Sequence, residues 1–280
     1  MQVEPSILRC GSRELDLSRP RVMGILNVTP DSFSDGGRFF DSERALDHAR
    51  CMRADGADII DVGGESTRPN AIAVDEHEEL TRVLPLVSAL ASEGALVSID
   101  TMKPRVMREA VDAGAAMIND VFALQAPGAL EAAADTNAAV CLMHMRGMPA
   151  TMQVDPIYAD VVGEVRDFLS ARAQACERVG MNRNRIAIDP GFGFGKTVAH
   201  NMRLLHELAA LAELGYPVVV GLSRKASLGT ITGRAADERV TASVAAALAA
   251  VARGASIVRV HDVRDTVDAL KVWQAIDDAL

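Results

Sequence analysis

The feature of this sequence that most restricts its fold is a short apolar run that recurs eight times. Each run is rich in valine and isoleucine and is bounded by turn residues, as expected of strands buried on both faces of a parallel sheet. The runs are VMGILNV (22–28), ADIIDVG (57–63), LVSIDT (96–101), MINDV (117–121), AVCLMH (139–144), RIAIDPG (185–191), PVVVGLS (217–223) and SIVRVH (256–261). Helix-like segments separate them. Several of these segments end at a glycine, which suits the left-handed position after a helix: Gly56, Gly94, Gly114, Gly180, Gly215 and Gly254.

Eight strand–helix units in 280 residues predict an α/β fold, a single (β/α)8 TIM barrel. A doubly wound open sheet is the alternative, but it usually has fewer strands and a glycine-rich fingerprint after the first one. Here NVTPDSFSDGG follows the first strand. The run ILRCGSRELDL (7–17) lies outside the repeat and predicts a short N-terminal β-hairpin. We expect residues 1–20, with this hairpin, to cap the bottom of the barrel and residues 21–280 to form the barrel as one domain.

Composition excludes several classes of protein. The net charge is −9 and the basic residues are spread along the chain, which argues against a nucleic-acid partner. No apolar stretch is long enough for a membrane span, and the first twenty residues lack the apolar core of a secretory signal, so we expect a cytoplasmic protein. The four cysteines are isolated, which favours reduced thiols over a structural zinc site.

The stretch DPGFGFGKT (189–197) resembles a phosphate-binding loop, but its spacing does not fit one. Counting back from Gly195 and Lys196 puts Pro190 where a P-loop needs its first glycine. The dinucleotide pattern G-x-G-x-x-G fails by register as well. The meaning of this stretch therefore depends on its place after the sixth strand, and we expect Lys196 and Thr197 to begin the next helix and steady the loop.

A polar residue stands at the end of every predicted strand, which is where barrel enzymes carry their sites. Polar groups on a core strand are costly unless they are paired. For any single residue a salt bridge at the barrel mouth is an adequate explanation, but packing alone does not explain the whole ring. The strand-end residues are Asn27, Asp61, Asp100, Asn119, Asp120, His144, Asp189, Ser223, Arg224, Lys225, Arg259, His261 and Asp262.

These residues, with the loop after the second strand, divide into two chemistries. Asp100, Asn119 and Asp189 suit a neutral heterocycle with a row of N–H and C=O groups. The other set consists of donors that suit an anion: Thr67, Arg68, Lys225, Arg259 and His261. The loops after strands seven and eight are the usual phosphate site of this fold, and Arg259 and His261 alternate along one strand, so both point the same way.

Eight motifs, in order, resemble those of the dihydropteroate synthase family, pterin-binding TIM barrels that are the target of sulfonamides. They are MGILNVTPDSFSDGG, ADIIDVGGESTRP, VSIDT, MINDV, LMHMRGMPATMQ, IAIDPGFGFGKT, GLSRK and VRVHDV. The likeness runs from about Val22 to the end of the chain. It implies a transferase of folate biosynthesis that condenses (7,8-dihydropterin-6-yl)methyl diphosphate with 4-aminobenzoate to give 7,8-dihydropteroate and diphosphate. It also implies a homodimer built from the late helices.

The resemblance further implies a role for each matching residue. The pterin would be bound by Asp100, Asn119, Asp189 and Lys225. The diphosphate would be bound by Asn27, Thr67, Arg68, Arg259 and His261. The 4-aminobenzoate pocket would be lined by Phe33, Pro69, Phe194 and Ser223. Asn27 and Asp35 would bind Mg²⁺, and the catalytic residues would be Asp35, Asp100, Lys225, Arg259 and His261.

Three other functions remain open from the residues. A related pterin-binding methyltransferase would keep the pterin-binding set but would need no diphosphate site, so the anion-binding donors favour the synthase. A catalytically inactive barrel would be expected to lose a charged residue at the mouth. A sugar-phosphate isomerase or aldolase should show a Schiff-base lysine or a glutamate base at a strand end; Lys225 follows the seventh strand, but it comes together with the pterin-binding set.

Overall fold

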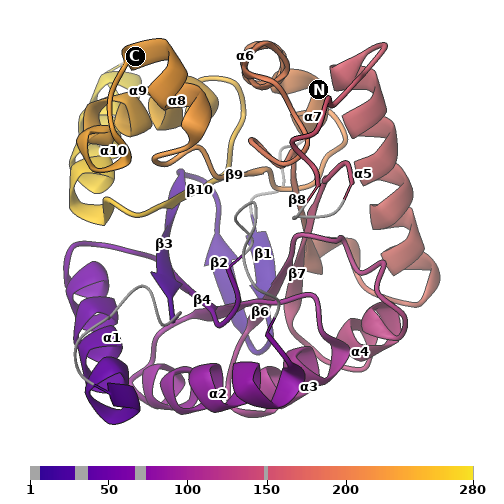
Figure 1. The fold of residues 1–280 in the computed structure, drawn as a ribbon, viewed down its shortest axis with the longest axis vertical. Helices are drawn as coiled ribbons and strands as arrows, with labels where there is room; N and C mark the ends of the chain where they lie inside the picture. Colours follow the sequence, from indigo (N-terminus) through magenta and orange to yellow (C-terminus); the bar gives the residue numbers. More distant parts are fainter. Residues whose placement is uncertain (1–6, 29–36, 67–73, 148–150, 280) are drawn as a thin grey trace.

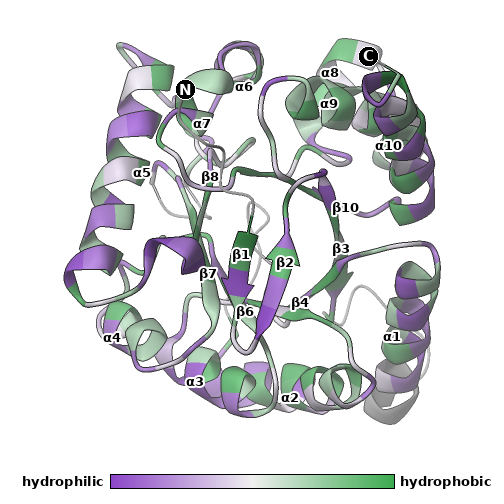
Figure 2. Ribbon diagram, turned by 180° about the vertical axis from the view of Figure 1, so that it is seen from behind, coloured by the Kyte–Doolittle hydropathy of each residue, from purple (hydrophilic) through white to green (hydrophobic). Residues whose placement is uncertain are grey.

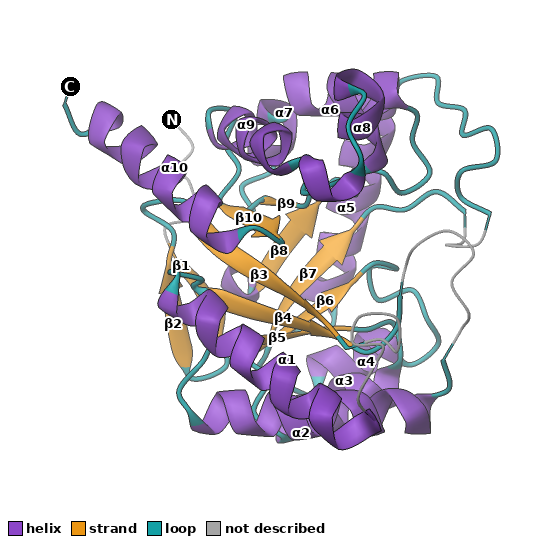
Figure 3. Ribbon diagram, turned by 60° about the vertical axis from the view of Figure 1, so that its left-hand side comes forward, coloured by secondary structure: helices purple, strands orange, loops and turns teal. Residues whose placement is uncertain are grey.

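The computed structural model describes residues 7–28, 37–66, 74–147 and 151–279, and of residues 37–41 it describes the backbone only. Eight parallel strands of this part form one sheet, in the order β8-β7-β6-β5-β4-β3-β10-β9. A parallel bridge between Ile188 and Val218 links the outer strands β8 and β9, so the sheet is nearly closed. The TIM barrel is therefore confirmed (Figures 1 and 3). The strands are β3 (Arg21–Asn27), β4 (Ile59–Gly63), β5 (Val97–Asp100), β6 (Met117–Asp120), β7 (Ala139–Met143), β8 (Ile186–Asp189), β9 (Val219–Val220) and β10 (Ile257–Val260).

Helices surround the strands as an outer ring (Figure 1). They are α1 (Gly37–Ala54), α2 (Glu76–Ser92), α3 (Pro104–Asp112), α4 (Ala129–Ala134), α5 (Val161–Arg178), α6 (Val198–His206), α7 (Ala209–Ala212), α8 (Ala226–Thr232), α9 (Val240–Val251) and α10 (Val263–Asp277). Helix α2 shows why they form: Asp75 caps its first turn by accepting a hydrogen bond from the Glu78 amide, and an apolar stripe from Leu80 to Leu90 is buried. The six glycines predicted at helix ends all have positive φ, between 72° and 113°.

The interior of the barrel changes from apolar to polar along each strand. In β6, Met117 points inward among apolar side chains at the amino-terminal end, and Ile118 points outward toward the helices. Asn119 points inward again, two residues further on, and donates to Asp61. Because side chains alternate along a strand, the same register places most polar groups inside the barrel near its carboxyl-terminal end, with Ser98 on β5 as a buried exception.

The predicted N-terminal hairpin is present and lies across the amino-terminal opening of the barrel (Figure 2). It consists of β1 (Ile7–Cys10) and β2 (Arg13–Asp16), paired antiparallel with Leu8 opposite Leu15. Its three inward side chains, Leu8, Cys10 and Leu15, share a buried cluster with the first inward residues of the barrel strands. The hairpin thus completes the apolar layer below the polar one. The division of the chain at residue 20 stays a prediction.

We predict that Leu8→Ala lowers the free energy of unfolding by about 2–5 kcal/mol, because it opens a cavity in a fully buried cluster. Urea denaturation checks this. Ile7→Ala is the matched control, since the adjacent side chain is 40% exposed and should cost less than about 0.5 kcal/mol. Equal losses for the two variants would contradict the role of the hairpin as part of the core.

Candidate active site at the barrel mouth

Arg259 on β10 lies at the centre of the polar layer. Its Nε donates to Asp61 Oδ2 on β4 at 2.6 Å, and its terminal nitrogen donates to Asp100 Oδ2 on β5 at 2.8 Å. Asn119 Nδ2 on β6 donates to the same Asp61 oxygen at 3.0 Å. Burial alone would lower the pKa of Arg259, but Asp61 and Asp100 outweigh it and raise that pKa, so the guanidinium stays charged. Side chains of four strands are therefore held together by one buried cation.

Burial raises the pKa of two carboxyl groups that line the cavity, Asp100 and Asp189. Burial raises the pKa of Asp100 to about 7, although Arg259 opposes the shift. Burial also raises the pKa of Asp189 to about 6, against the hydrogen bond that its Oδ1 accepts from the Gly191 amide at 2.6 Å and against the charge of Lys225. Both groups can therefore accept hydrogen bonds from a ligand once they have lost their protons.

A small cavity opens over this layer and combines a polar floor with an apolar wall. The floor includes Asp100, Asn119, Asp189 and Arg259, and the wall includes Phe194. The cavity is lined by Asp100, Asn119, Val121, Met143, Asp189, Gly191, Phe192, Phe194, Gly221, Lys225 and Arg259. The structure thus brings the whole predicted pterin-binding set together. Lys225 Nζ lies 4.2 Å from the centre of the Phe194 ring, a cation–π contact that connects floor and wall.

Ser223 and His261 meet at the rim of the barrel. The Ser223 hydroxyl oxygen accepts from the His261 amide at 3.1 Å and lies 3.0 Å from the ring Nδ1. This contact extends the pairing between β10 and β9 beyond their backbone hydrogen bonds. Those hydrogen bonds are few because β9 has only two residues. Ser223 is buried and is not one of the residues that line the cavity, so its place in a benzoate pocket stays a prediction.

The turn that presents Lys225 is held in an unusual conformation. Arg224 has a φ of 57°, in the left-handed region that side chains other than glycine rarely adopt. Its amide donates to Ser243 Oγ at 2.9 Å, its carbonyl accepts from Arg239 at 2.9 Å, and its guanidinium pairs with Asp262. For Arg224 and Asp262 the salt-bridge explanation holds: they pair with each other.

Asn27 reaches the same layer from the end of β3. A Cβ on Gly63 would lie 3.7 Å from Asn27 Oδ1 and 3.8 Å from Asp100 Oδ2, both ordinary contact distances, so the two oxygens lie on the same side of this glycine. An amide oxygen beside a carboxylate is a suitable donor set for a hard cation such as Mg²⁺. In the part of the chain that the structure describes, no cluster of three or more His, Cys, Asp or Glu side chains could hold a metal by itself. Mg²⁺ bound here would therefore also need oxygens from a ligand or from other residues.

Five predicted site residues lie outside the described residues: Phe33, Asp35, Thr67, Arg68 and Pro69. On either side of residues 67–73, two described residues are linked: Glu65 Oε1 accepts from the Val74 amide at 3.2 Å. Glu65 Oε2 also pairs with Lys103 Nζ at 2.5 Å, and Lys103 pairs in turn with the buried Glu79. Glu65 is thus held both by Val74 and by Lys103.

Sequence reasoning gave no site role to Asp61, although it ends a predicted strand. The structure makes it the partner of both Arg259 and Asn119, and its Oδ1 has no hydrogen-bond partner among the described residues. Asp120 faces away from the cavity and accepts from the amides of Phe122 and Leu124 at 2.7 Å each. Alternation along β6 distinguishes it from Asn119, and that signal is readable from sequence.

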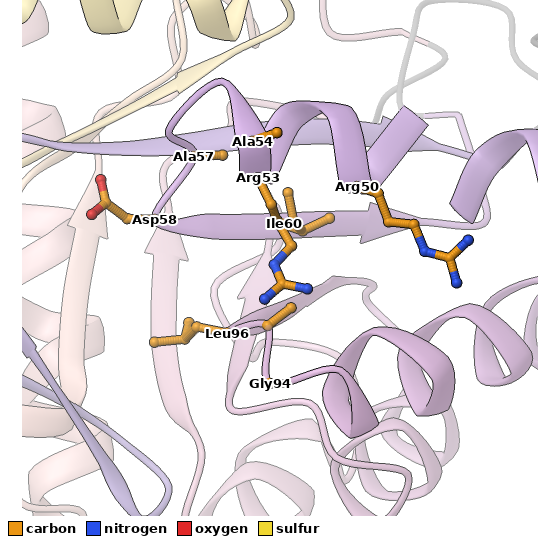
Figure 4. A pocket seen from close by; sticks show the side chains of 9 residues that line it. Arg50, Arg53, Ala54, Ala57, Asp58, Ile60, Gly94 and Leu96 are labelled. Carbon is orange, nitrogen blue, oxygen red and sulfur yellow. The ribbon is translucent and has the colours of Figure 1, made fainter. Parts of the chain in front are cut away.

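A second cavity, of about 500 Å³, lies at the opposite end of the barrel, beside the amino-terminal ends of β4 and β5 (Figure 4). Its charged lining residues are Arg50, Arg53 and Asp58. Arg50 pairs with Glu93 at 2.6 Å, and Asp58 pairs with Arg21 at 3.1 Å. It includes none of the strand-end residues, so the chemistry indicated by the sequence lies at the other end.

The fold is a (β/α)8 barrel with a polar cavity at the carboxyl-terminal ends of its strands. Comparisons with known proteins agree: the family model described as pterin binding enzyme matches residues 23–261. The dihydropteroate synthase of Haemophilus influenzae is 50% identical over 273 residues, which cover 97% of this chain and 99% of that protein. The solved dihydropteroate synthase of Xanthomonas albilineans with 4-aminobenzoic acid is 54% identical, with a TM-score of 0.93 over 98% of this chain and 99% of that one.

A third relative is the Burkholderia cenocepacia dihydropteroate synthase solved with 7,8-dihydropteroate. It is 51% identical, with a TM-score of 0.90 over 99% of this chain and 98% of that one. The chain therefore belongs to the dihydropteroate synthase family of pterin-binding enzymes.

We predict that Asp189→Asn gains stability relative to the wild type as pH rises from about 4 to about 6. The folded-state pKa of Asp189 lies above its unfolded value, so the wild-type fold binds an extra proton in this window and loses stability as that proton leaves. The gain should be on the order of 1–3 kcal/mol in denaturant unfolding of the ligand-free protein. Asp277→Asn, on an exposed position of α10, should show no such trend. If the difference in the free energy of unfolding between Asp189→Asn and the wild type did not change with pH, the Asp189 carboxyl would not be desolvated.

Proposed function

We propose that this chain, a transferase of the dihydropteroate synthase family, condenses (7,8-dihydropterin-6-yl)methyl diphosphate with 4-aminobenzoate to give 7,8-dihydropteroate and diphosphate. The observation that carries this proposal is the convergence of Asp100, Asn119, Asp189, Lys225 and Arg259 on one cavity. The relatives solved with 4-aminobenzoic acid and with 7,8-dihydropteroate support the same pair of substrate and product.

In this proposal the polar floor binds the pterin ring. The carboxylate of Asp189 accepts from the ring N–H groups, and Asn119 offers both an acceptor and a donor. Lys225 donates to a ring acceptor from its position over Phe194. Asp100 also lines the cavity. Its carboxylate, like that of Asp189, is negative when ionised, so it can stabilise the cation that develops on the methylene carbon.

The reaction itself needs no side-chain nucleophile. The bond between the methylene carbon and the diphosphate oxygen breaks, and its electron pair leaves with the diphosphate. The amine nitrogen of 4-aminobenzoate then forms the new bond to carbon and loses a proton. Donors aimed at the leaving group stabilise its growing charge. We assign this role to Arg259 on β10 and His261 directly after that strand, with Thr67 and Arg68.

A Mg²⁺ ion held by Asn27 and Asp35 would add electrostatic stabilisation of the diphosphate charge. The amide oxygen of Asn27 at the mouth supports this assignment. Phe194, with Phe33 and Pro69, would provide the apolar wall for the benzoate ring.

The comparisons give no support to the related methyltransferase, because the relatives cited are synthases. The inactive barrel is also disfavoured, since each described residue of the predicted pterin set is in place at the cavity.

We expect pyrophosphate release from the pterin diphosphate to depend on 4-aminobenzoate and to stop when Mg²⁺ is chelated. Lys225→Ala should weaken pterin binding by about 2–5 kcal/mol, because it removes one partner of a charged hydrogen bond in a buried site. Lys271→Ala, an exposed change on α10, is the control. Benzoate-independent release, or none at all from the intact protein, would refute the proposed activity.

We propose a homodimer formed through the late helices. Val272 and Ile276 are 63% and 62% exposed and lie one turn apart on α10, and Ile231 on α8 is 56% exposed. Helices α8, α9 and α10 also lie together on one side of the barrel (Figure 1). No helix in the described residues is long and apolar enough to cross a membrane. A cytoplasmic location and the absence of a nucleic-acid partner stay predictions from the sequence.

Sedimentation equilibrium should therefore give twice the chain mass, and Val272→Glu with Ile276→Glu should give the monomer, because two charges would be buried at the contact. Val179→Glu, at an exposed apolar position after α5, should leave the dimer intact. A monomeric wild type would refute the dimer. A dimer that tolerates both glutamates would place its contact elsewhere.

A further inference from the structure

The loop after β8, residues 190–196, packs directly on the backbone that follows β7. Gly191 and Gly195 have φ of 68° and 64°. A Cβ on Gly191 would lie 1.9 Å from the His144 carbonyl oxygen, and one on Gly195 would lie 2.3 Å from that of Arg146. Glycine is required at both positions because the two loops touch through their main chains.

The side chain of Lys196 is buried inside this contact, and the residue is only 3% exposed. Its Nζ lies 2.9 Å from His144 Nδ1, 3.0 Å from the Gly191 carbonyl oxygen, 3.1 Å from that of Phe194 and 3.3 Å from that of His144. Burial lowers the pKa of Lys196 to about 7, so below that pH the group is an ammonium with three donors and no acceptor, and the His144 nitrogen accepts. Burial and the charge of Lys196 lower the pKa of His144 to about 3, which agrees with a neutral ring.

We propose that Lys196 is a positioning residue that fixes Phe194 against the end of β7 and thereby sets the affinity of the site for the benzoate substrate. The assignment to benzoate rests on the proposed function. The link between Lys196 and the loop rests on the contacts alone.

Other contacts hold the edges of the loop but do not replace this link. Asn201 accepts from the Gly193 amide at 2.9 Å, and the Tyr158 hydroxyl donates to the Gly195 carbonyl at 2.8 Å. The Phe194 carbonyl, by contrast, is tied to β7 through Lys196. The ring of Phe194 lines the cavity, so a shift of its backbone changes the apolar wall directly.

The effect should be separable from pterin binding. Asp189 is held by the sheet, because its carbonyl accepts from the His144 amide at 2.9 Å, and by the Gly191 amide. Loss of the Lys196 charge would favour protonation of Asp189, since that charge opposes its raised pKa. Burial lowers the pKa of Lys196 to about 7. Kinetics at about pH 7, one unit above the pKa of about 6 for Asp189, therefore keep Asp189 mostly ionised while about half of Lys196 stays protonated.

The test is Lys196→Met, which keeps the aliphatic length and removes the donors. At saturating pterin diphosphate we expect the KM for 4-aminobenzoate to rise about tenfold or more, as for the loss of a hydrogen bond to a charged group. The kcat and the KM for pterin diphosphate should change less than about threefold. Lys196→Gln, which retains two donors, should lie between the wild type and Lys196→Met and serves if the methionine variant folds poorly. Arg166→Met, at an exposed position of α5, is the control.

Hydrogen exchange of the ligand-free protein gives a readout that does not need activity. In Lys196→Met the amides of Gly193 and Phe194 should exchange about tenfold faster or more, whereas those of β8 should keep their protection. Unchanged exchange, or equal losses across β8 and the loop, would overturn the link to Phe194. A benzoate KM that stays unchanged in an active Lys196→Met variant would overturn the effect on affinity. An inactive wild type would refute the proposed function instead, and exchange would still decide the positioning role.

Discussion

The mouth of this barrel depends on one buried cation. Arg259 binds carboxylates from two other strands, and one of those carboxylates also binds Asn119 on a third. Burying these charges is tolerable only because they are paired, and removing Arg259 would leave two buried carboxylates uncompensated. The same pairing fixes the spacing of the side chains on the cavity floor. Stability and site geometry therefore depend on the same contacts.

The apolar layer below offsets the energetic cost of burying these polar groups. The hairpin and the first inward residues of the strands form an apolar cluster that supplies burial without polar cost. Loops contribute in a different way, since the loop after β8 is held by a buried ammonium that satisfies main-chain carbonyls from two loops. The site thus combines groups fixed by the sheet with a wall fixed by one side chain.

The eight apolar runs were enough to predict the barrel. A short, continuous apolar run between turn residues is the pattern expected of a strand buried on both faces, and it recurs eight times. β9 is shorter than its run, since beyond Val220 the pairing passes to the Ser223 side chain. Strand-end position alone did not separate Asp61, which belongs to the central cluster, from Asp262, which pairs with Arg224. Partners so distant in sequence are set by the closure of the barrel, and no local pattern encodes them. The fourfold coordination of Lys196 was likewise beyond a sequence argument that placed it only at the start of a helix.

The formal charges in and beside the cavity cancel. Asp61, Asp100 and Asp189 are matched by Arg259, Lys225 and Lys196, all of them near the end of a barrel strand. Such a neutral interior can admit an uncharged heterocycle without importing an ion. A diphosphate adds negative charge that these six groups cannot offset by themselves, so Arg259 can stabilise it only together with donors at the rim. The charge balance therefore orients a molecule that carries both a heterocycle and a diphosphate. Its uncharged ring can enter the interior, and its diphosphate must stay at the rim, where further cations can reach it.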